Sequence, residues 1–374
     1  MTSDAPFEIF LAAPPGLEAV LAGEAREQGF ANPTTSAGGV TVQGDWPEVW
    51  RANLELRCAS RVLVRIGAFR AFHLAQLDKR ARRFPWGDVL RADVPVRVEA
   101  TCRRSKIYHA GAATQRIARA ITEELGAPVS EEAGLRVLAR IDDNLVTLSI
   151  DTSGDPLHRR GHKVVVGKAP LRETLAAAFL RQCGYDGNGP VVDPMCGAGT
   201  FVLEAAEIAA ALPPGRSRSF AFETLATFDP AGWEAMRKAG SGAAAPAGTA
   251  RFWGYDRDAG AISMSRENAK RAGVTDAVAF AQQPISDLQR PEGPPGLVIV
   301  NPPYGGRIGN KKLLYALYGT LGQVLKERFA GWKVGLVTSE PSLARATGLP
   351  FHAPGAPVPN GGIRVHLYRT DPLR

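Results

Sequence analysis

The chain has 374 residues, of which 45% are hydrophobic and 22% charged, so it can bury ordinary cores and is not a disordered polymer. Its apolar runs are far shorter than a membrane-spanning helix requires, and its N-terminus lacks a basic stretch followed by an apolar one, so we expect neither a membrane span nor a secretory signal. The four cysteines lie far apart without metal-ligand spacing, so we expect no disulfide framework, no metal site and a cytoplasmic location.

The net charge of +8 is unevenly distributed along the chain. Residues 61–119 contain 14 Lys or Arg and four acidic residues, a local charge of +10, and the rest of the chain sums to about −2. Such asymmetry favours a polyanionic partner for the N-terminal half. The alternative is a solvated basic surface without a function.

Short strands and amphipathic helices alternate through the first half of the chain. The expected elements are strands at 7–12, 40–42 and 61–69, with helices at 16–25 and 46–54. A second unit follows, with a strand at 94–100, a helix at 114–125, and a hairpin of strands 135–141 and 145–150. The β-α-β-α-β order of the first unit predicts a compact sheet with helices on one side. Residues 151–170, rich in Gly, Pro and basic residues, are expected to form a linker.

Longer helices alternate with buried strands in the second half, which is typical of a doubly wound, mostly parallel sheet. Helices are expected at 171–182, 199–211, 259–272 and 313–329, and strands at 191–192, 251–255, 297–300, 333–338 and, antiparallel, 363–368. The low-complexity segment 239–250 is expected to be a flexible excursion. The sequence thus predicts an α/β protein with three domains, at 1–68, 69–155 and 156–374.

A glycine-containing loop, Asp193-Pro-Met-Cys-Gly-Ala-Gly-Thr200, follows the strand at 191–192 and leads into a helix. Ligands of open α/β sheets bind at the carboxyl ends of strands, and Gly197 and Gly199 allow close approach to the backbone. The loop contains no Lys or Arg, which argues against a phosphate site. An acidic residue at its start suits a cationic nucleoside ligand such as S-adenosylmethionine; the alternative is a tight turn without a ligand.

Asp256 ends the next strand, where a carboxylate can accept hydrogen bonds from both ribose hydroxyls. It lies 63 residues after Asp193, too far for a minimal β-α-β unit, so residues 212–250 must contain an insertion. For the nearby Asp258 we expect a cap on the following helix.

The tetrad Asn301-Pro302-Pro303-Tyr304 directly follows the strand at 297–300. The Asn301 side-chain oxygen and the Pro302 carbonyl can accept both hydrogens of a base amine and steer its lone pair toward a methyl donor. Pro303 stiffens the loop, and Tyr304 can stack on an extruded base. No dedicated base is needed, because the amine becomes strongly acidic once methylated. The alternative is a Pro-Pro turn that ends a buried strand.

These motifs resemble the amino-methyltransferase branch of the Rossmann-like methyltransferases. The whole chain is similar to the THUMP-containing RNA guanine-N2 methyltransferases, and to the first half of the bifunctional bacterial 23S rRNA enzymes. The stretch Arg103-Arg-Ser-Lys-Ile-Tyr-His109 and the segment from His158 to Ala176 add to this resemblance. It implies a ferredoxin-like unit at 1–68, a THUMP-like RNA-binding domain at 69–155 and a Rossmann-like methyltransferase domain from 156. By the same resemblance, the contacts to S-adenosylmethionine come from Cys196, Gly197, Gly199, Thr200 and Asp256.

Two departures from the family pattern stand out. Pro284 occupies the position where an acidic residue usually binds the cofactor adenine, so we expect Asp287 or the Gln283 side chain to substitute. The sequence ends soon after the last expected strand, so we expect no second methyltransferase domain in it.

The expected partner is RNA, with ribosomal RNA favoured over transfer RNA, and the expected state is a monomer or weak dimer. A groove for the RNA backbone is expected to be formed by Arg103, Arg104, Lys106, Arg159 and Arg160. A DNA adenine or cytosine amino-methyltransferase, a protein glutamine methyltransferase and a non-catalytic RNA-binding protein remain alternatives. The basic N-terminal half argues against the first two, and the intact tetrad argues against the third.

Overall fold

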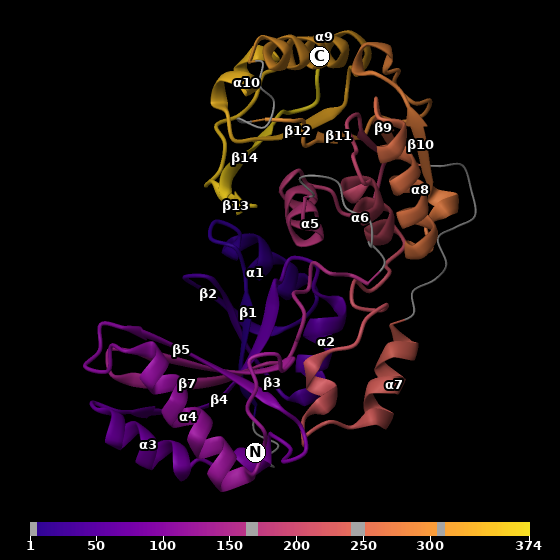
Figure 1. Cartoon of the computed structure of the whole chain (residues 1–374). Coiled ribbons are helices and arrows are strands. Elements are labelled where there is room, and N and C mark those ends of the chain that lie inside the picture. Colours follow the sequence, from indigo (N-terminus) through magenta and orange to yellow (C-terminus); the bar gives the residue numbers. More distant parts are fainter. Residues whose placement is uncertain (1–5, 162–170, 241–250, 305–310) are drawn as a thin grey trace. The chain divides into compact units, whose positions relative to one another are not determined.

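A computed structural model describes residues 6–161, 171–240, 251–304 and 311–374 (Figure 1). The chain divides into two compact units, and its path crosses between them more than once. Unit 1 comprises Met1–Ala13, Leu21–Leu157 and Arg218–Ala239; unit 2 comprises Pro14–Val20, His158–Ser217 and Gly240–Arg374. Among the described helices, none has the length and apolar content needed to cross a membrane.

Unit 1 is built on one seven-stranded sheet with the strand order β2-β3-β1-β4-β7-β6-β5. The strands are β1 (Phe7–Ala12), β2 (Ala31–Ser36), β3 (Gly39–Gly44), β4 (Arg61–Arg70), β5 (Val96–Arg103), β6 (Leu135–Asp142) and β7 (Leu145–Asp151). Its principal helices are α1 (Glu18–Glu27), α2 (Trp46–Glu55), α3 (Leu74–Arg82), α4 (Ala110–Leu125) and α7 (Pro230–Ala239). Every second residue of β6 is buried, as expected of a strand whose sheet is covered on one face.

The two N-terminal units expected from the sequence share this sheet, because β4 pairs with β1 on one side and with β7 on the other. The ferredoxin-like unit expected at 1–68 and the THUMP-like domain expected at 69–155 therefore correspond to two halves of one sheet. β2 was missed by the sequence reasoning because its side chains are polar and mostly exposed, so it has no alternating apolar pattern. α3 was also missed.

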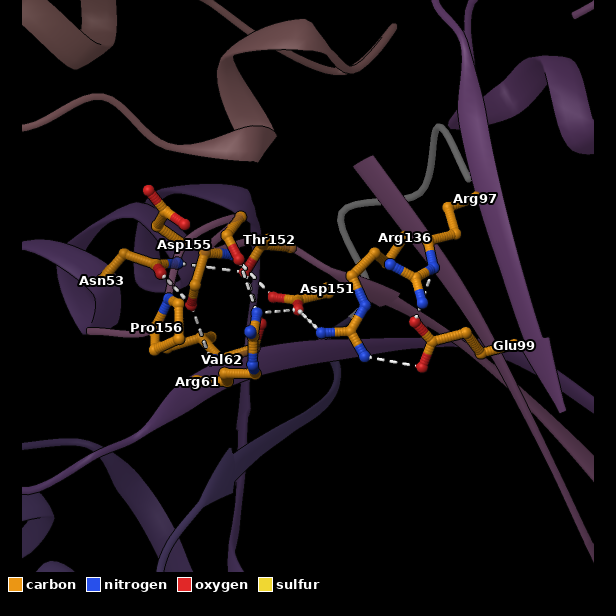
Figure 2. Close-up of polar contacts among 12 residues, drawn as sticks. Asn53, Arg61, Val62, Arg97, Glu99, Arg136, Asp151, Thr152, Asp155 and Pro156 are labelled. Carbon is orange, nitrogen blue, oxygen red and sulfur yellow. Dashed lines mark hydrogen bonds and ion pairs between the residues drawn. The ribbon is translucent and has the colours of Figure 1, made fainter. Parts of the chain in front are cut away.

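A chain of ion pairs crosses the join between the two halves (Figure 2). Asp151 ends β7 with no exposed side-chain surface and pairs with Arg61 of β4 and, at 3.5 Å, with Arg136 of β6. Arg136 also pairs with Glu99 of β5 at 2.8 Å, and Glu99 with Arg97 at 3.0 Å. The network therefore links four adjacent strands, and removing Asp151 would leave two arginines without their shared partner.

The prediction of a linker at 151–170 is wrong for its first three residues. Asp151, Thr152 and Ser153 are fully buried, and the Thr152 hydroxyl donates to the Val62 carbonyl at 2.7 Å. These residues are small and polar, and tertiary hydrogen bonds rather than local propensity hold Thr152 and Ser153 against the sheet directly after β7. Residues 162–170 of the expected linker lie outside the described part of the chain.

The insertion expected within 212–250 returns to unit 1. Its aromatic side chains pack on Trp50 of α2: Trp50 stacks on Phe222 with ring centroids 6.1 Å apart, and Phe222 meets Trp233 edge-on at 5.0 Å. Aromatic contacts of this kind bury large apolar areas, which explains why Arg218–Ala239 groups with the N-terminal residues. Most of the expected flexible excursion at 239–250 lies outside the described residues.

Unit 2 is a second seven-stranded sheet with the order β10-β9-β8-β11-β12-β14-β13. Its strands are β8 (Val191–Asp193), β9 (Phe252–Asp256), β10 (Val278–Gln282), β11 (Leu297–Val300), β12 (Lys333–Thr338), β13 (Val358–Asn360) and β14 (Ile363–Arg369). Its helices are α5 (Glu173–Gln182), α6 (Thr200–Ala209), α8 (Ala259–Ala272), α9 (Lys311–Arg328) and α10 (Pro341–Ala346).

Strands β8 to β12 run parallel, and β14 is antiparallel to β12. This confirms the predicted doubly wound α/β fold with an antiparallel last strand. The near-continuous apolar strand β11 is buried along its whole length, as strands covered on both faces require. The short elements α10 and β13 were missed, since six and three residues carry too little periodic signal.

Candidate active site

Three functional segments predicted from the sequence come together at the carboxyl edge of the unit 2 sheet. β8 lies between β9 and β11 and is parallel to both. Asp193 ends β8, Asp256 ends β9, and Asn301 directly follows β11. β8 precedes both neighbours in sequence, so the strand order reverses here, and ligands of open α/β sheets bind at such a point.

The glycine loop after β8 is fastened to the end of β9. The Cys196 N–H donates to the Tyr255 carbonyl at 2.8 Å, and the Gly197 N–H donates to Asp256 Oδ2 at 3.0 Å. Gly197 has a φ of +53°, and no atom lies within 4 Å of the position a Cβ would occupy. The loop therefore presents bare backbone to open space, as close approach by a ligand requires.

Two side chains of α8 brace the back of this loop. The Ser265 hydroxyl donates to the Gly197 carbonyl at 2.8 Å, and the Asn268 amide donates to the Ala198 carbonyl at 3.2 Å. Both side chains are fully buried. The sequence reasoning missed them, although polar residues three apart on the apolar side of a helix could have indicated a buried partner.

Gly199 ends the loop in the left-handed region, with a φ of +84°, and α6 begins at the next residue, Thr200. A Cβ at Gly199 would lie 3.1 Å from the Phe280 ring and 3.2 Å from Ser265. Both its dihedral angle and its surroundings therefore require glycine.

Cys196 points its side chain away from the open side of the loop. Its Sγ lies 3.8 Å from the Ser265 hydroxyl and 3.1 Å from the position of a Cβ at Gly254. Burial raises the pKa of this thiol well above its usual range, so it remains protonated. The side chain of Cys196 thus packs behind the loop, and a ligand would meet the backbone.

The charge at the site is acidic. Burial raises the pKa of Asp193 well above its usual range, a hydrogen bond from the Met195 N–H opposes this, and nearby Asp256 raises it further. In the described part of the chain, no Lys or Arg pairs with either carboxylate. A cationic ligand would relieve this unfavourable pair of acids, so the residues present fit the ammonium and sulfonium of S-adenosylmethionine.

Three further positions surround Asp256. Asp258 caps α8 by accepting from the Gly260 N–H at 2.7 Å, as predicted. The Gln283 N–H donates to the Asp256 carbonyl at 2.9 Å, which places Gln283 beside the ribose-binding candidate. Asp287 is exposed in the short 3₁₀ helix Ile285–Asp287, and its carboxylate accepts from the Ser286 hydroxyl at 2.9 Å.

The Asn-Pro-Pro-Tyr loop after β11 contains an acceptor without a donor. Asn301 Oδ1 is buried, and it has no hydrogen-bond partner among the described residues. The Pro303 carbonyl lies 3.3 Å from the hydroxyl of Tyr318 on α9, and the Tyr304 hydroxyl lies 3.4 Å from the amide of Asn360 on β13. Buried polar atoms are usually paired, so Asn301 Oδ1 is a candidate acceptor for the donor that the sequence predicts at this position.

Comparison with known families identifies the chain. Residues 160–365 match a family model described as the RMKL-like methyltransferase domain, and residues 8–63 match the RlmL ferredoxin-like domain. The chain belongs to the RMKL-like methyltransferase family. The glycine loop and the Asn-Pro-Pro-Tyr loop both lie within the matched methyltransferase segment.

Curated relatives of this RMKL-like methyltransferase carry RNA-related names. A ribosomal RNA large subunit methyltransferase K/L of Syntrophotalea carbinolica is 36% identical, covering 98% of this chain and 54% of the relative. The chain thus spans about half the length of the K/L relatives it matches, because the matched region covers 54% of the first relative and 50% of the second. A putative RNA methyltransferase of Synechocystis, slr0064, is 30% identical and covers 95% of this chain and 94% of the relative.

Solved structures agree with this assignment over the whole chain. A putative methyltransferase, SMU.472, determined in complex with SAH, is 27% identical with a TM-score of 0.87 and covers 100% of both chains. A protein of Listeria monocytogenes described as a predicted N6-adenine-specific DNA methylase is 30% identical with a TM-score of 0.86, covering 97% of this chain and 96% of that one.

The basic residues predicted to bind RNA lie in both units of this RMKL-like methyltransferase. Arg103, Arg104 and Lys106 are exposed in unit 1; Arg104 pairs with Asp142 at 2.8 Å. Arg159 is exposed in unit 2. The prediction that Arg160 lines an RNA groove is wrong. This residue is only 2% exposed and pairs with Glu204 at 3.3 Å, so it cannot line an open groove. The described residues contain no group of three or more His, Cys, Asp or Glu that could hold a metal ion.

Proposed function

We propose that the chain transfers a methyl group from S-adenosylmethionine to the exocyclic N2 amine of a guanine in structured RNA, with 23S ribosomal RNA as the favoured substrate. The observation that carries this proposal is the buried, unpaired Asn301 Oδ1 at the sheet edge beside the glycine loop. An orphan acceptor in that position suits a donor with two hydrogens, such as a base amine.

The glycine loop and the two aspartates form the cofactor side of the site. S-adenosylmethionine, when bound, supplies an electrophilic methyl on a sulfonium. Asp256 holds the ribose hydroxyls, and its fixed position follows from the Gly197 and Asp258 N–H groups that already orient its two oxygens. Asp193 contributes negative charge in a buried setting, where charge acts strongly on a cationic ligand.

Asn301 and the Pro302 carbonyl form the substrate side. The amine lone pair of guanine is delocalised into the ring, which makes the nitrogen a poor nucleophile. Two acceptors fixed on its hydrogens favour the tetrahedral geometry and aim the lone pair at the methyl carbon, a preorganisation effect. Tyr304 stacks on the extruded base.

RNA is favoured over DNA and protein as the substrate class. Relatives that share a third of their residues with the chain are named ribosomal RNA methyltransferases, and residues 61–119 carry a charge of +10. The description of the Listeria protein as a predicted N6-adenine-specific DNA methylase keeps a DNA amine as the second candidate, since the same acceptors serve an adenine amine.

The test is transfer of tritiated methyl groups to undermodified ribosomal RNA, transfer RNA and DNA, followed by nucleoside digestion and chromatography. We expect N2-methylguanosine, from ribosomal RNA in preference to the other two. A product methylated on a ring nitrogen, a ribose or a carbon would contradict the role assigned to Asn301 and Pro302, and N6-methyladenine from DNA would establish the second candidate.

RNA binding has its own test in the whole 374-residue chain, because α7 packs with the N-terminal residues and a truncation at residue 155 would remove it. Reversing the charges of Arg103, Arg104 and Lys106 should weaken RNA binding and flatten its salt dependence, since fewer counterions are released. Equal affinity of wild type and triple variant at near-physiological salt would show that these residues serve another purpose.

A further inference from the structure

The Asn-Pro-Pro-Tyr loop is poor in the groups that normally hold a loop in place. Pro302 and Pro303 have no backbone N–H, so between Asn301 and Tyr304 the chain offers carbonyls and no donors. The residue before a proline is restricted to extended conformations, which stiffens the loop internally. It does not orient the loop against the rest of the domain, so an outside donor must do so.

Tyr318 is such a donor. It lies on α9, which packs with β11 and β12 in one hydrophobic core, and it has no exposed surface. Its hydroxyl is 3.3 Å from the Pro303 carbonyl. Figure 1 shows where α9, β11 and β12 lie in the fold. On its other side, the hydroxyl of buried Thr338, at the end of β12, lies 3.4 Å away. Burial raises the pKa of Tyr318, so its phenol keeps its proton and can donate.

The Tyr318 hydroxyl lies within reach of two oxygens but has one hydrogen to donate. The Pro303 carbonyl can only accept, whereas the Thr338 hydroxyl can donate or accept, so both contacts form together only when the Tyr318 hydrogen goes to Pro303. In that arrangement Thr338 donates to the Tyr318 oxygen. The Thr338 oxygen in turn accepts from the Glu340 N–H at 3.2 Å. Backbone N–H, threonine, tyrosine and proline carbonyl thus form a directed series in which each bond strengthens the next.

We infer that Tyr318 is a positioning residue for methyl transfer: it anchors the Pro303 carbonyl to the core, so that the neighbouring Pro302 carbonyl and Asn301 Oδ1 stay directed at the substrate amine. Tyr318 touches neither substrate nor cofactor. Its effect reaches the reaction through the loop, and the inference rests on the proposed function of that loop.

The experiment compares the wild-type 374-residue chain with its Tyr318→Phe, Thr338→Val and Thr338→Ser variants. Tyr318→Phe removes only the hydroxyl, so kcat should fall by about tenfold, with the RNA KM and the Kd for S-adenosylmethionine changed by less than about twofold. Thr338→Val should lower kcat less, because it leaves the bond to Pro303 in place, and Thr338→Ser should restore kcat by restoring the hydroxyl. Tyr315→Phe, one turn earlier on α9 and half-exposed, is the matched control and should behave as wild type.

A second measurement does not depend on activity. Hydrogen–deuterium exchange of the segment 297–304 should be faster in Tyr318→Phe than in wild type or Tyr315→Phe, with the added exchange at Tyr304, since the prolines have no amide hydrogen. An unchanged kcat in Tyr318→Phe, or a fall matched by equal losses in KM and cofactor affinity, would overturn the inference. If wild type methylates no guanine, the proposed function fails, and unchanged exchange would then also reject the anchoring by Tyr318.

Discussion

The two loops that form the candidate site are held in place by opposite means. The glycine loop is fastened through its backbone: two of its N–H groups donate to β9, and two of its carbonyls accept from Ser265 and Asn268. The Asn-Pro-Pro-Tyr loop has almost no backbone donors and relies on side chains of α9 and β13 at 3.3 and 3.4 Å. Its acceptor Asn301 Oδ1 is buried and has no hydrogen-bond partner among the described residues.

This difference follows from what each loop has to do. A cofactor site must keep its shape while a large cation enters and leaves, and the hydrogen bonds of the glycine loop to β9 and α8 hold it in place. An acceptor loop must keep one acceptor unsatisfied until a base arrives, and proline stiffness replaces hydrogen bonds that would otherwise compete for it. Changes in the first loop should therefore affect binding, and changes in the second should affect the chemical step.

The largest effect is expected for Asn301→Ala. Without the side-chain oxygen the amine stays planar and conjugated, so kcat should fall by on the order of a hundredfold or more. Cofactor affinity, measured by isothermal titration, should remain within about twofold of wild type, because Asn301 does not belong to the glycine loop. A variant that lost cofactor binding along with activity would show that the two loops are not separate in function.

Asp193→Asn should affect the cofactor side alone and weaken S-adenosylmethionine binding by about tenfold or more, since the buried negative charge that attracts the cation is lost. The asparagine keeps the acceptor for the Met195 N–H, so the loop should retain its shape. Titration calorimetry measures the affinity, and methyl transfer at saturating cofactor should recover most of the wild-type kcat.

The same substitution predicts a pH-dependent gain in the stability of the ligand-free protein. Burial raises the pKa of Asp193, so the folded protein binds this proton more tightly than the unfolded chain does. Its contribution to stability is therefore present at low pH and is lost as the pH rises from the ordinary carboxyl pKa of about 4 through the raised value. Thermal unfolding midpoints of wild type should fall relative to Asp193→Asn across that window; a constant difference would contradict the buried-acid interpretation.

Ser265→Ala should produce a smaller loss on the same side. It frees the Gly197 carbonyl from a 2.8 Å hydrogen bond, and the loss of one neutral hydrogen bond should weaken cofactor binding by about fivefold. Ser263→Ala, on the exposed side of α8, is the matched control. An effect on kcat rather than on affinity would remove the distinction between the two loops.

The position of the candidate site could be predicted from the sequence better than the residues that support it. Asp193, Asp256 and Asn301 follow buried apolar strands, so their place at the sheet edge could be predicted from the local pattern. Ser265 and Tyr318 act across tertiary contacts 68 and 15 residues away from their partners, and nothing local distinguishes them from ordinary helical residues. The prediction that Arg160 lines an RNA groove was wrong for a related reason: a single sequence does not distinguish an exposed basic linker residue from a buried ion-pair partner.

Aromatic packing explains the main difference between the fold expected from the sequence and the fold observed. Residues 212–250 were correctly expected to interrupt the methyltransferase sheet, but their destination could not be predicted. The segment joins unit 1 through Phe222 and Trp233 packing near Trp50, and such contacts between distant residues leave no periodic trace in the sequence.

The smallest effect is expected for Asp287→Ala, at the outer edge of the cofactor side. Asp287 is exposed and accepts from its own neighbour Ser286 at 2.9 Å, so any hydrogen bond to the adenine amine competes with water and with that hydroxyl. Exposed contacts of this kind contribute little, and cofactor affinity should fall by no more than about threefold.

Gln283→Ala is the informative comparison for Asp287→Ala, because Gln283 is less exposed and its backbone is fixed to Asp256. Titration of both variants with S-adenosylmethionine and with a cofactor analogue lacking the adenine amine decides between them. The residue that contacts the amine will lose discrimination between the two ligands when it is replaced by alanine. If Asp287→Ala weakened cofactor binding as strongly as Asp193→Asn, an exposed side chain would contribute as much as the buried glycine loop. That result would contradict the conclusion that the hydrogen-bonded glycine loop dominates cofactor binding.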